Sequence, residues 1–230
     1  QEIVPLTEKS GTVLQDEGIR AATTVEKLAE LKTVFKKDGT VTAGNASTIN
    51  DGAAMVLIAS KSYCEEHQIP YLAVIKEIVE VGFAPEIMGI SPIKAIDTLL
   101  KNQALTIEDI GIFEINEAFA ASSIVVEREL GLDPKKVNRF GGGISLGHAI
   151  GATGARIATT VAYQLKDTQE RYGIASLCVG GGLGLAMLLE NPSATVSQTN
   201  FDEESASEKT EKKKFYALAP NERLAFLEAQ

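Results

Sequence analysis

The sequence predicts an α/β fold, because β-branched apolar segments alternate with segments of helical periodicity along most of its 230 residues. Two strand-then-helix units carry this prediction: residues 72–83 before 91–100, and residues 111–115 before 117–130. A third apolar helix after Gly147 and two apolar runs joined by glycines complete the pattern. Alternation of this kind is typical of α/β domains.

The amino-terminal part of the chain is mixed in composition and predicts peripheral structure. A short helix is expected at residues 24–31, closed by the Lys-Asp-Gly turn signal at 37–39. The Asn-Asp-Gly signal at 50–52 marks another turn. Residues 53–60 are almost wholly apolar, so we expect a buried strand there and then a short helix to His67.

The next segments form the two main units. Residues 72–83 are rich in valine and isoleucine, which favour strands. Ser91 and Pro92 mark a helix start, with serine as the cap and proline at the first helical position. A brief apolar strand at 111–115 leads into a helix at 117–130, which the following glycine stops.

The last core elements are a helix and a hairpin. Ile150, Ile157 and Val161 are in rough helical register after Gly147. Residues 175–190 form two apolar runs separated by three consecutive glycines, which predicts a β-hairpin.

Beyond the hairpin the composition changes. Residues 192–213 are rich in Ser, Thr, Glu and Lys and cannot bury enough apolar surface to offset the entropy of ordering, so we expect a flexible linker. Residues 214–230 form a short amphipathic stretch that is too small to fold alone. It is expected to be the start of a truncated downstream domain.

Composition excludes several classes of function. A content of 44% apolar and 23% charged residues is that of a globular protein, and no apolar run approaches the roughly 18 residues of a membrane span. The net charge of −9 argues against nucleic acid or an anionic membrane as partner. Two cysteines and two histidines, widely spaced, predict neither a disulfide framework nor a metal site, and they fit a cytoplasmic location.

Three polar residues are candidates for chemistry because each lies where a strand ends or a helix begins: Asn116, His148 and Cys178. Glycines around His148 allow close backbone approach, and a helix N-terminus would keep its imidazole neutral and available as a base. A purely structural histidine with satisfied hydrogen bonds is the alternative.

Cys178 ends an apolar run and meets three glycines, whose backbone N–H groups could line an oxyanion site. The alternative is a buried core cysteine, which is also the interpretation we give to Cys64. Glu117 is either a general base or an acidic residue placed by the helix dipole. The glycine runs lack the spacing and the Lys-Ser or Lys-Thr of nucleotide-binding loops.

Three motifs together resemble the thiolase family: Asn-Glu-Ala-Phe at 116–119, Gly-His-Ala-Ile-Gly at 147–151 and Cys-Val-Gly-Gly-Gly at 178–182. Their order and spacing match, and the resemblance runs over residues 2–190, about the second half of a thiolase subunit. Residues 38–54 resemble the coenzyme A loop of the family and the strand after it.

The resemblance implies a thiolase-like α/β fold, namely the C-terminal βαβαβαββ-type half together with the end of the loop domain and of the N-terminal half. Residues 1–46 would end the loop domain and contain the coenzyme A loop. Residues 47–70 would supply a strand and a helix that complete the N-terminal domain, and residues 71–191 would form the C-terminal domain.

The resemblance also implies an activity, the condensation of two acetyl-CoA to acetoacetyl-CoA and CoA, and the reverse thiolysis. The cysteine that becomes acylated would lie outside this chain, and His148 would activate it. Cys178 would remove a proton from the methyl carbon of the second acetyl-CoA and return it in thiolysis. Asn116 would fix a water that binds the enolate oxygen with His148, and the N–H of Gly180 would belong to a second oxyanion hole.

For the substrate, the family pattern places Ser47, Met88 and Phe119 along the pantetheine and Arg20 near the nucleotide end. Met88 and Phe119 are alternatively ordinary core side chains, and Arg20 a solvated surface charge. Coenzyme A thioesters are expected as substrates, with no tightly bound cofactor and no metal.

The motifs depart from the family in two places. Ala149 stands where proline is usual, and Phe140 interrupts the usual Asn-Gly-Gly lead-in. Asn116 stands where ketoacyl synthases of the same superfamily have histidine, which favours a thiolase.

The sequence at 214–227 resembles the opening of class II hydroxymethylglutaryl-CoA reductases. This resemblance implies a bacterial bifunctional enzyme of mevalonate synthesis. The expected partners are then the N-terminal half of the thiolase, coenzyme A, further copies in a homo-oligomer and a fused reductase. The alternatives are a non-catalytic coenzyme A-binding or assembly fragment and a ketoacyl synthase-type enzyme.

Overall fold

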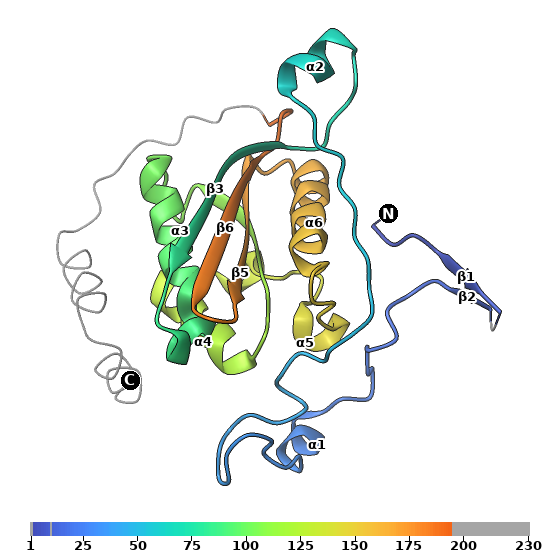
Figure 1. Ribbon diagram of the computed structural model, residues 1–230, viewed down its shortest axis with the longest axis vertical. Helices are drawn as coiled ribbons and strands as arrows, with labels where there is room; N and C mark the ends of the chain where they lie inside the picture. Colours follow the sequence, from blue (N-terminus) through green and yellow to red (C-terminus); the bar gives the residue numbers. More distant parts are fainter. Residues whose placement is uncertain (1, 10, 195–230) are drawn as a thin grey trace.

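The computed structural model describes residues 2–9 and 11–194 (Figure 1). Nearly all of the expected linker at 192–213, and all of the expected downstream segment at 214–230, lie outside the described residues.

A four-stranded sheet forms the centre of the structure, in the order β3-β6-β5-β4. Its strands are β3 (Val74–Gly82), β4 (Ile110–Ile115), β5 (Tyr172–Val179) and β6 (Leu183–Glu190). Only β4 and β5 are parallel, and β5 and β6 form the predicted hairpin. The remaining elements of this part are η1 (Pro85–Ile90), α3 (Ser91–Asn102), α4 (Ala120–Leu130), η2 (Pro134–Lys136), α5 (Gly143–Leu146) and α6 (Thr153–Thr168).

The amino-terminal segment runs along the outside of this unit (Figure 1). It contains a small hairpin of β1 (Leu6–Glu8) and β2 (Gly11–Val13), then α1 (Val25–Ala29) and α2 (Lys61–Glu66). Both predicted short helices are therefore confirmed.

Helices cover both faces of the sheet, so the predicted α/β class is confirmed. α3 and α4 lie on one face and α6 on the other (Figure 1). Within β4, Phe113 and Ile115 pack towards α3 and α4, whereas Ile112 packs against α6. Because both faces are covered, β4 is buried along its whole length, and a buried strand of this kind has a continuous apolar sequence.

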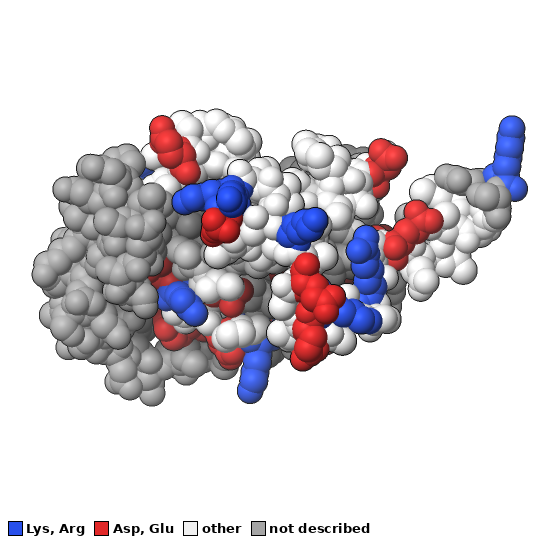
Figure 2. Space-filling model, turned by 90° about the horizontal axis from the view of Figure 1, so that it is seen from below, with Lys and Arg blue, Asp and Glu red and all other residues white. Residues whose placement is uncertain are grey.

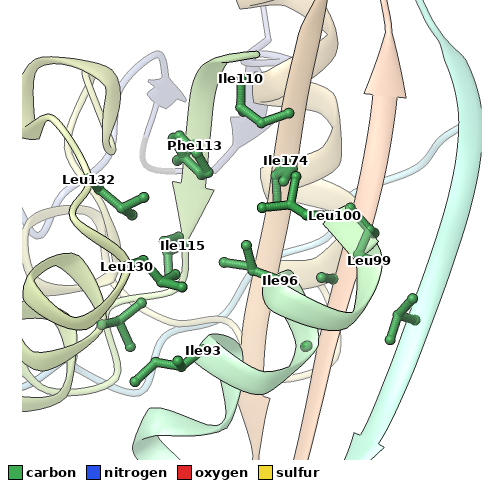
Figure 3. Close-up of a cluster of buried hydrophobic side chains, with 14 of the residues drawn as sticks. Ile93, Ile96, Leu99, Leu100, Ile110, Phe113, Ile115, Leu130, Leu132 and Ile174 are labelled. Carbon is green, nitrogen blue, oxygen red and sulfur yellow. The ribbon is translucent and has the colours of Figure 1, made fainter. Parts of the chain in front are cut away.

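The larger core lies between the sheet and α3. Ile93, Ile96, Leu99 and Leu100 recur at helical spacing on α3 and meet Phe113 of the sheet (Figure 3). Burial of these side chains is the main favourable term that holds this face together.

The smaller core lies under α6, where Ile157, Val161 and Leu165 pack on the opposite face of the sheet. The predicted helical register is confirmed for Ile157 and Val161. It is wrong for Ile150, which precedes the helix and is 71% exposed.

The predicted buried strand at residues 53–60 is wrong. This segment has no regular structure and is exposed throughout, with Met55 at 94% and Leu57 at 97% exposure. A strand needs a hydrogen-bonded neighbour, and no described segment pairs with these residues. Apolar composition alone predicted burial and could not show where the covering surface is.

The predicted helix cap at Ser91 is also wrong. α3 begins at Ser91 directly after η1, and the cap position is Ile90, which has no capping side chain. The Ser91 hydroxyl instead donates to the backbone oxygen of Leu183 at 2.8 Å, which ties α3 to the start of β6. Pro92 does lie in the first turn of the helix, as predicted.

Two further boundaries differ from prediction. α4 begins at Ala120 and not at residue 117, although it ends as predicted before Gly131, whose φ of 63° is left-handed. The strand implied before the third helix is reduced to an isolated bridge between Val137 and Phe113.

Asn138 replaces part of this missing strand. Its Oδ1 accepts from Ile115 N at 2.8 Å, and its Nδ2 donates to Ile115 O at 2.9 Å. The side chain therefore satisfies both backbone groups at the end of β4. Its own backbone has a φ of 44°, a left-handed conformation that asparagine tolerates better than most residues.

Replacing Asn138 with alanine should destabilise the fold by about 1–3 kcal/mol, because two buried backbone groups of Ile115 lose their partner. The measurement is urea unfolding of the full-length protein, compared with Asn102→Ala. Asn102 lies at an exposed helix end and bonds only a carboxylate of Glu77, so its loss should change the midpoint little. Equal midpoints for the two variants would contradict the role given to Asn138.

Surface charge is mixed on the face seen in Figure 2, where acidic and basic side chains are interspersed. None of the helices in residues 2–9 and 11–194 has the length and apolarity needed to cross a membrane.

Candidate active site

The candidate site lies at one edge of the central sheet, where β4 and β5 end. Because these two strands are parallel, residues at their carboxyl ends meet at the same edge. Asn116 follows β4 directly, and its N–H donates to Ser176 O of β5 at 2.9 Å. Cys178 is the last but one residue of β5.

His148 reaches the same edge through the loop between α5 and α6. Gly143 at the start of α5 lies against Asn116, since a side chain there would come within 3.2 Å of Asn116 Oδ1. Gly154 at the start of α6 lies against Leu177, the neighbour of Cys178, since a Cβ atom at Gly154 would lie 3.7 Å from Leu177 Cδ2. The structure thus brings the three predicted residues to one edge, although among the described residues no hydrogen bond joins their side chains directly.

A segment from far earlier in the chain holds the backbone of His148. The N–H of His148 donates to Thr48 O at 2.9 Å, and Asn50 N donates to His148 O at 3.4 Å. Gly147 has a φ of 97°, and a side chain there would collide with the side chain of Asn50. Glycine before the histidine is therefore required by both the backbone conformation and the tether.

The imidazole of His148 is oriented by Thr153. His148 Nδ1 lies 2.7 Å from Thr153 Oγ1, and that hydroxyl donates to Ala149 O at 3.1 Å. Because the single hydroxyl proton is used there, we assign Nδ1–H as the donor to Thr153 and leave the lone pair on Nε2.

The electrostatics also favour a neutral His148. Burial lowers the pKa of His148, and the positive charge of Arg156 lowers it further. At neutral pH the side chain is consequently an unprotonated base.

Cys178 is partly buried, and this burial raises the pKa of its thiol, opposed in part by a backbone hydrogen bond. At neutral pH it is therefore a thiol and not a thiolate. Gly180 and Gly181, which follow, border open space where added side chains would meet nothing within 4 Å. The hairpin turn next to Cys178 thus leaves room for a ligand.

Asn116 is 5% exposed, and its Oδ1 has no hydrogen-bond partner. Buried acceptors are normally satisfied, so an acceptor left over at the edge of a site indicates a place for a water or a ligand donor. This fits the water-fixing role that the family pattern implies for Asn116.

Glu117 has a structural task. Its carboxylate accepts from Asn138 Nδ2 and from the N–H of Ile144, both at 3.2 Å. The second contact satisfies a free donor at the start of α5. The interpretation that the dipole of its own helix places Glu117 is wrong, because α4 begins only at Ala120. The contacts of the carboxylate are structural and give no support to a general base.

Ser47 and Phe119 of the predicted substrate-lining set lie side by side. The backbone N–H and the hydroxyl of Ser47 both donate to Ala118 O, at 3.0 and 3.2 Å. Phe119 stacks edge-to-face with Phe35, with ring centroids 6.0 Å apart. The expected coenzyme A loop is therefore fastened to the start of α4.

Met88 and Arg20 are placed differently. Met88 is half-buried in η1, and the adjacent Gly89 lies against Ser122 of α4, the helix that begins after Phe119. Arg20 is exposed, and its side chain makes no hydrogen bond or ion pair with any other described residue. The structure brings Met88 to the same helix as the other lining residues and leaves Arg20 apart.

Sequence reasoning missed Thr153, which contacts His148, Arg156 on the same helix, and Glu114, the buried carboxyl that Arg156 faces. Glu114 is only 1% exposed, and burial, the dominant effect, raises its pKa to about 7. A charged residue inside the apolar run at 110–115 was the available signal for Glu114. Thr153 and Arg156 gave no such signal, because their role depends on how α6 packs.

No cluster of three or more potential metal ligands occurs in the part of the chain that the structure describes.

Comparison with known proteins gives consistent matches. The family model "Thiolase, C-terminal domain" matches residues 69–191, and "Thiolase, N-terminal domain" matches residues 1–62. A "Probable acetyl-CoA acyltransferase" of Staphylococcus aureus is 50% identical over 193 residues, which cover 82% of this chain and 49% of that protein.

Two solved structures are similar over the same region. Human mitochondrial 3-ketoacyl-CoA thiolase in complex with CoA has a TM-score of 0.76 and 42% identity, covering 81% of this chain and 47% of that one. The dimeric peroxisomal thiolase of Saccharomyces cerevisiae has a TM-score of 0.78 and 42% identity, covering 83% and 48%. The chain thus spans about half the length of these proteins.

Proposed function

The chain belongs to the thiolase family, and on that premise we propose that it supplies the carboxyl-terminal half of an acyltransferase active site. The reaction is the condensation of two acetyl-CoA to acetoacetyl-CoA and CoA, together with the reverse thiolysis. The observation that carries the proposal is the meeting of Asn116, His148 and Cys178 at one sheet edge, with His148 neutral and Cys178 protonated.

His148 acts as the base for the nucleophile. The cysteine that becomes acylated lies in the N-terminal half, outside this chain. Nε2 of His148 carries the lone pair, because Nδ1 is engaged by Thr153. It takes the proton of the nucleophilic thiol, and the resulting thiolate attacks the keto carbon of acetoacetyl-CoA.

Cys178 moves the second proton. In thiolysis the bond between C2 and C3 breaks and its electron pair passes to C2, which leaves as the enolate of acetyl-CoA. The Cys178 thiol protonates C2 and becomes a thiolate, which takes the proton of the incoming CoA thiol. The CoA thiolate then takes the acetyl group from the nucleophilic cysteine, and that cysteine recovers its proton from His148. The raised pKa of Cys178 suits this task, because the group must arrive protonated.

The oxyanions are stabilised by donors already in place. Asn116 positions a water which, with His148, meets the enolate oxygen of the thioester, and its unpartnered Oδ1 fits such a water. Gly180 offers its N–H at the open turn beside Cys178 to the oxygen of the acylated cysteine.

Coenzyme A thioesters are the substrates, with no tightly bound cofactor. Ser47 and Phe119 at the start of α4, and Met88 on the neighbouring η1, line the pantetheine. Arg20 meets the nucleotide end. The 3-ketoacyl-CoA thiolase of human mitochondria, which this chain resembles, was solved with CoA.

The test is thiolysis of acetoacetyl-CoA by the full-length protein, followed as loss of the 3-ketothioester with CoA present. Turnover is expected. Binding of CoA without turnover would favour the non-catalytic alternative. Turnover that requires an acyl carrier protein would favour a ketoacyl synthase.

The N-terminal half of the thiolase is the proposed partner of the exposed segment at 53–60. Met55, Leu57 and Ile58 are apolar side chains that the described residues leave uncovered. The complete subunit forms a homo-oligomer, as the dimeric thiolase of Saccharomyces cerevisiae does. Light scattering of the full-length protein measures this state, and a monomer would contradict it.

The wider context is proposed from the sequence after residue 213, which lies outside the described residues. Its likeness to class II hydroxymethylglutaryl-CoA reductases supports a fused reductase, a bacterial source, a role in mevalonate synthesis and a cytoplasmic location. Reductase activity of the full-length protein with hydroxymethylglutaryl-CoA and a nicotinamide cofactor tests the fusion.

A further inference from the structure

Glu117 joins the segment that carries Asn116 to the turn that leads to His148. Its carboxylate accepts from Asn138 Nδ2 and from Ile144 N, both at 3.2 Å, so it bridges two points of the chain that runs into α5. The side chain is half-buried, and it does not cap α4, which has no side-chain cap. The carboxylate therefore holds the start of α5 against the end of β4.

The start of α5 is packed closely against residues 116 and 117. A side chain at Gly142 would collide with the carboxylate of Glu117. A Cβ atom at Gly143 would lie 3.0 Å from Glu117 O and 3.2 Å from Asn116 Oδ1. Neither glycine has a positive φ, so the missing side chains serve the close approach and not an unusual backbone conformation.

The amide of Asn116 depends on this packing. The backbone of Asn116 is fixed, because its N–H donates to Ser176 O at 2.9 Å. Its Oδ1, the atom that lies against Gly143, has no hydrogen-bond partner. An atom without a hydrogen bond is held by its packing neighbours, so the position of α5 determines where this amide points.

His148 is held by other contacts. Its backbone N–H and C=O pair with Thr48 and Asn50, and its Nδ1 lies 2.7 Å from Thr153 Oγ1. None of these contacts involves Glu117. Loss of the Glu117 carboxylate should therefore displace the start of α5 relative to the Asn116 amide and leave the imidazole in place.

We propose that Glu117 is a positioning residue for the oxyanion hole of the enolate. By holding the start of α5 against Asn116, it keeps the amide directed to the water that Asn116 shares with His148. The inference rests on the proposed function, because that oxyanion hole belongs to the proposed reaction. Glu117 transfers no proton, so the site needs an acceptor at the position of Oε2 and not a negative charge.

The test compares two reactions of the full-length protein that use different oxyanion sites. Exchange of the methyl hydrogens of acetyl-CoA with solvent passes through the enolate and uses Asn116. Isotope exchange between acetyl-CoA and free CoA passes through the acylated cysteine and uses Gly180. Glu117→Ala should lower the first rate by about 10-fold or more and the second by less than about threefold, because small displacements at a reacting centre are costly. The ratio of the two rates does not depend on the folded fraction of the protein.

Glu117→Gln separates positioning from proton transfer. The amide oxygen of glutamine can accept from Ile144 N, whereas its NH₂ group cannot replace the contact with Asn138 Nδ2, which is also a donor. This variant should recover most of the methyl exchange that Glu117→Ala loses. A glutamine variant as slow as the alanine variant would show that the carboxylate charge is needed, as in a general base, and would overturn the positioning role.

Glu77→Ala is the matched control. Glu77 is also half-buried, and its carboxylate also accepts two hydrogen bonds, from the side-chain amides of Asn102 and Gln103 at 2.6 and 2.7 Å. These contacts join β3 to the end of α3 and involve no residue of the candidate site. Glu77→Ala should leave the ratio of the two exchange rates unchanged.

Hydrogen–deuterium exchange at residues 142–147, followed by mass spectrometry, needs no turnover. Glu117→Ala should speed exchange at the N–H of Ile144, which loses its acceptor, whereas Glu77→Ala should not. Unchanged exchange there, or equal loss of both reaction rates in Glu117→Ala, would overturn the role of Glu117. A parent protein without thiolysis, in which Glu117→Ala still speeds this exchange, would contradict the proposed function and leave the tether between Glu117 and α5 standing.

Discussion

Cys178→Ala in the full-length protein is expected to lower kcat for thiolysis by about 10²–10⁴-fold, the usual contribution of a positioned general acid. Without the thiol, the enolate that leaves when the carbon–carbon bond breaks has no proton donor. Exchange of the methyl hydrogens of acetyl-CoA with solvent should fall by a similar factor. Isotope exchange between acetyl-CoA and free CoA should persist, because no carbon is protonated in this exchange and His148 can pass the proton of the nucleophilic thiol to the leaving CoA.

Cys64→Ala is the matched control for this prediction. Cys64 is the other cysteine of the chain, buried in α2. Its removal should leave thiolysis within about twofold of the parent, because the change affects packing and not the site. Near-normal thiolysis by Cys178→Ala would remove Cys178 from the mechanism.

The alkaline side of the thiolysis profile gives a further check on Cys178. A proton donor works only while it holds its proton, and burial raises the pKa of this thiol. In a pH profile of kcat for thiolysis, the alkaline limb should therefore lie above the ordinary pKa of a solvent-exposed cysteine thiol.

His148→Ala should lower the rate of thiolysis and the rate of exchange between acetyl-CoA and CoA, each by about 10²-fold or more. The second effect separates this variant from Cys178→Ala, because without the base the nucleophilic thiol is not activated. In the parent protein the acid limb of kcat/KM should lie below the ordinary pKa of histidine. The sign follows from the lowered pKa of His148, which keeps the base unprotonated to lower pH.

His67→Ala is the control for His148. His67 ends α2, where its Nδ1 lies 3.1 Å from Tyr63 O and its ring stacks on Tyr63. Its loss should affect α2 locally and leave both reactions intact. Retained exchange in His148→Ala would exclude His148 as the activating base.

The sequence predicted the elements whose own pattern matches their environment. α3 and α6 have apolar faces at helical spacing, and β4 is a continuous apolar run because helices cover both of its sides. The segment at 53–60 has the same apolar signal but no covering surface among the described residues, so its strand was predicted wrongly. An apolar sequence pattern indicates that a segment must be buried, but it does not show which surface covers the segment.

The candidate site divides in the same way. Asn116, His148 and Cys178 were found because each is a reactive side chain beside a strand end or a glycine turn. Their ordered spacing led to the family, which the family models confirm. Arg156 and Glu114 could not be found, because the contact between them exists only once α6 packs on β4. Tertiary pairing of this kind leaves no mark at short sequence range.

The backbone tether between residues 48–50 and His148 has a consequence for how such a chain can change over generations. The absence of a side chain at Gly147 leaves space for the side chain of Asn50, and the backbone oxygen of Thr48 accepts from the N–H of His148. Residues 48–50 and residues 147–148 therefore depend on each other, and together they form one joint between two distant parts of the chain. A recombination event that exchanged one side of this joint from a diverged parent would leave the other side mismatched. Exchanges with both ends between residues 51 and 146 keep the joint whole, and inherited variation is least constrained by it there.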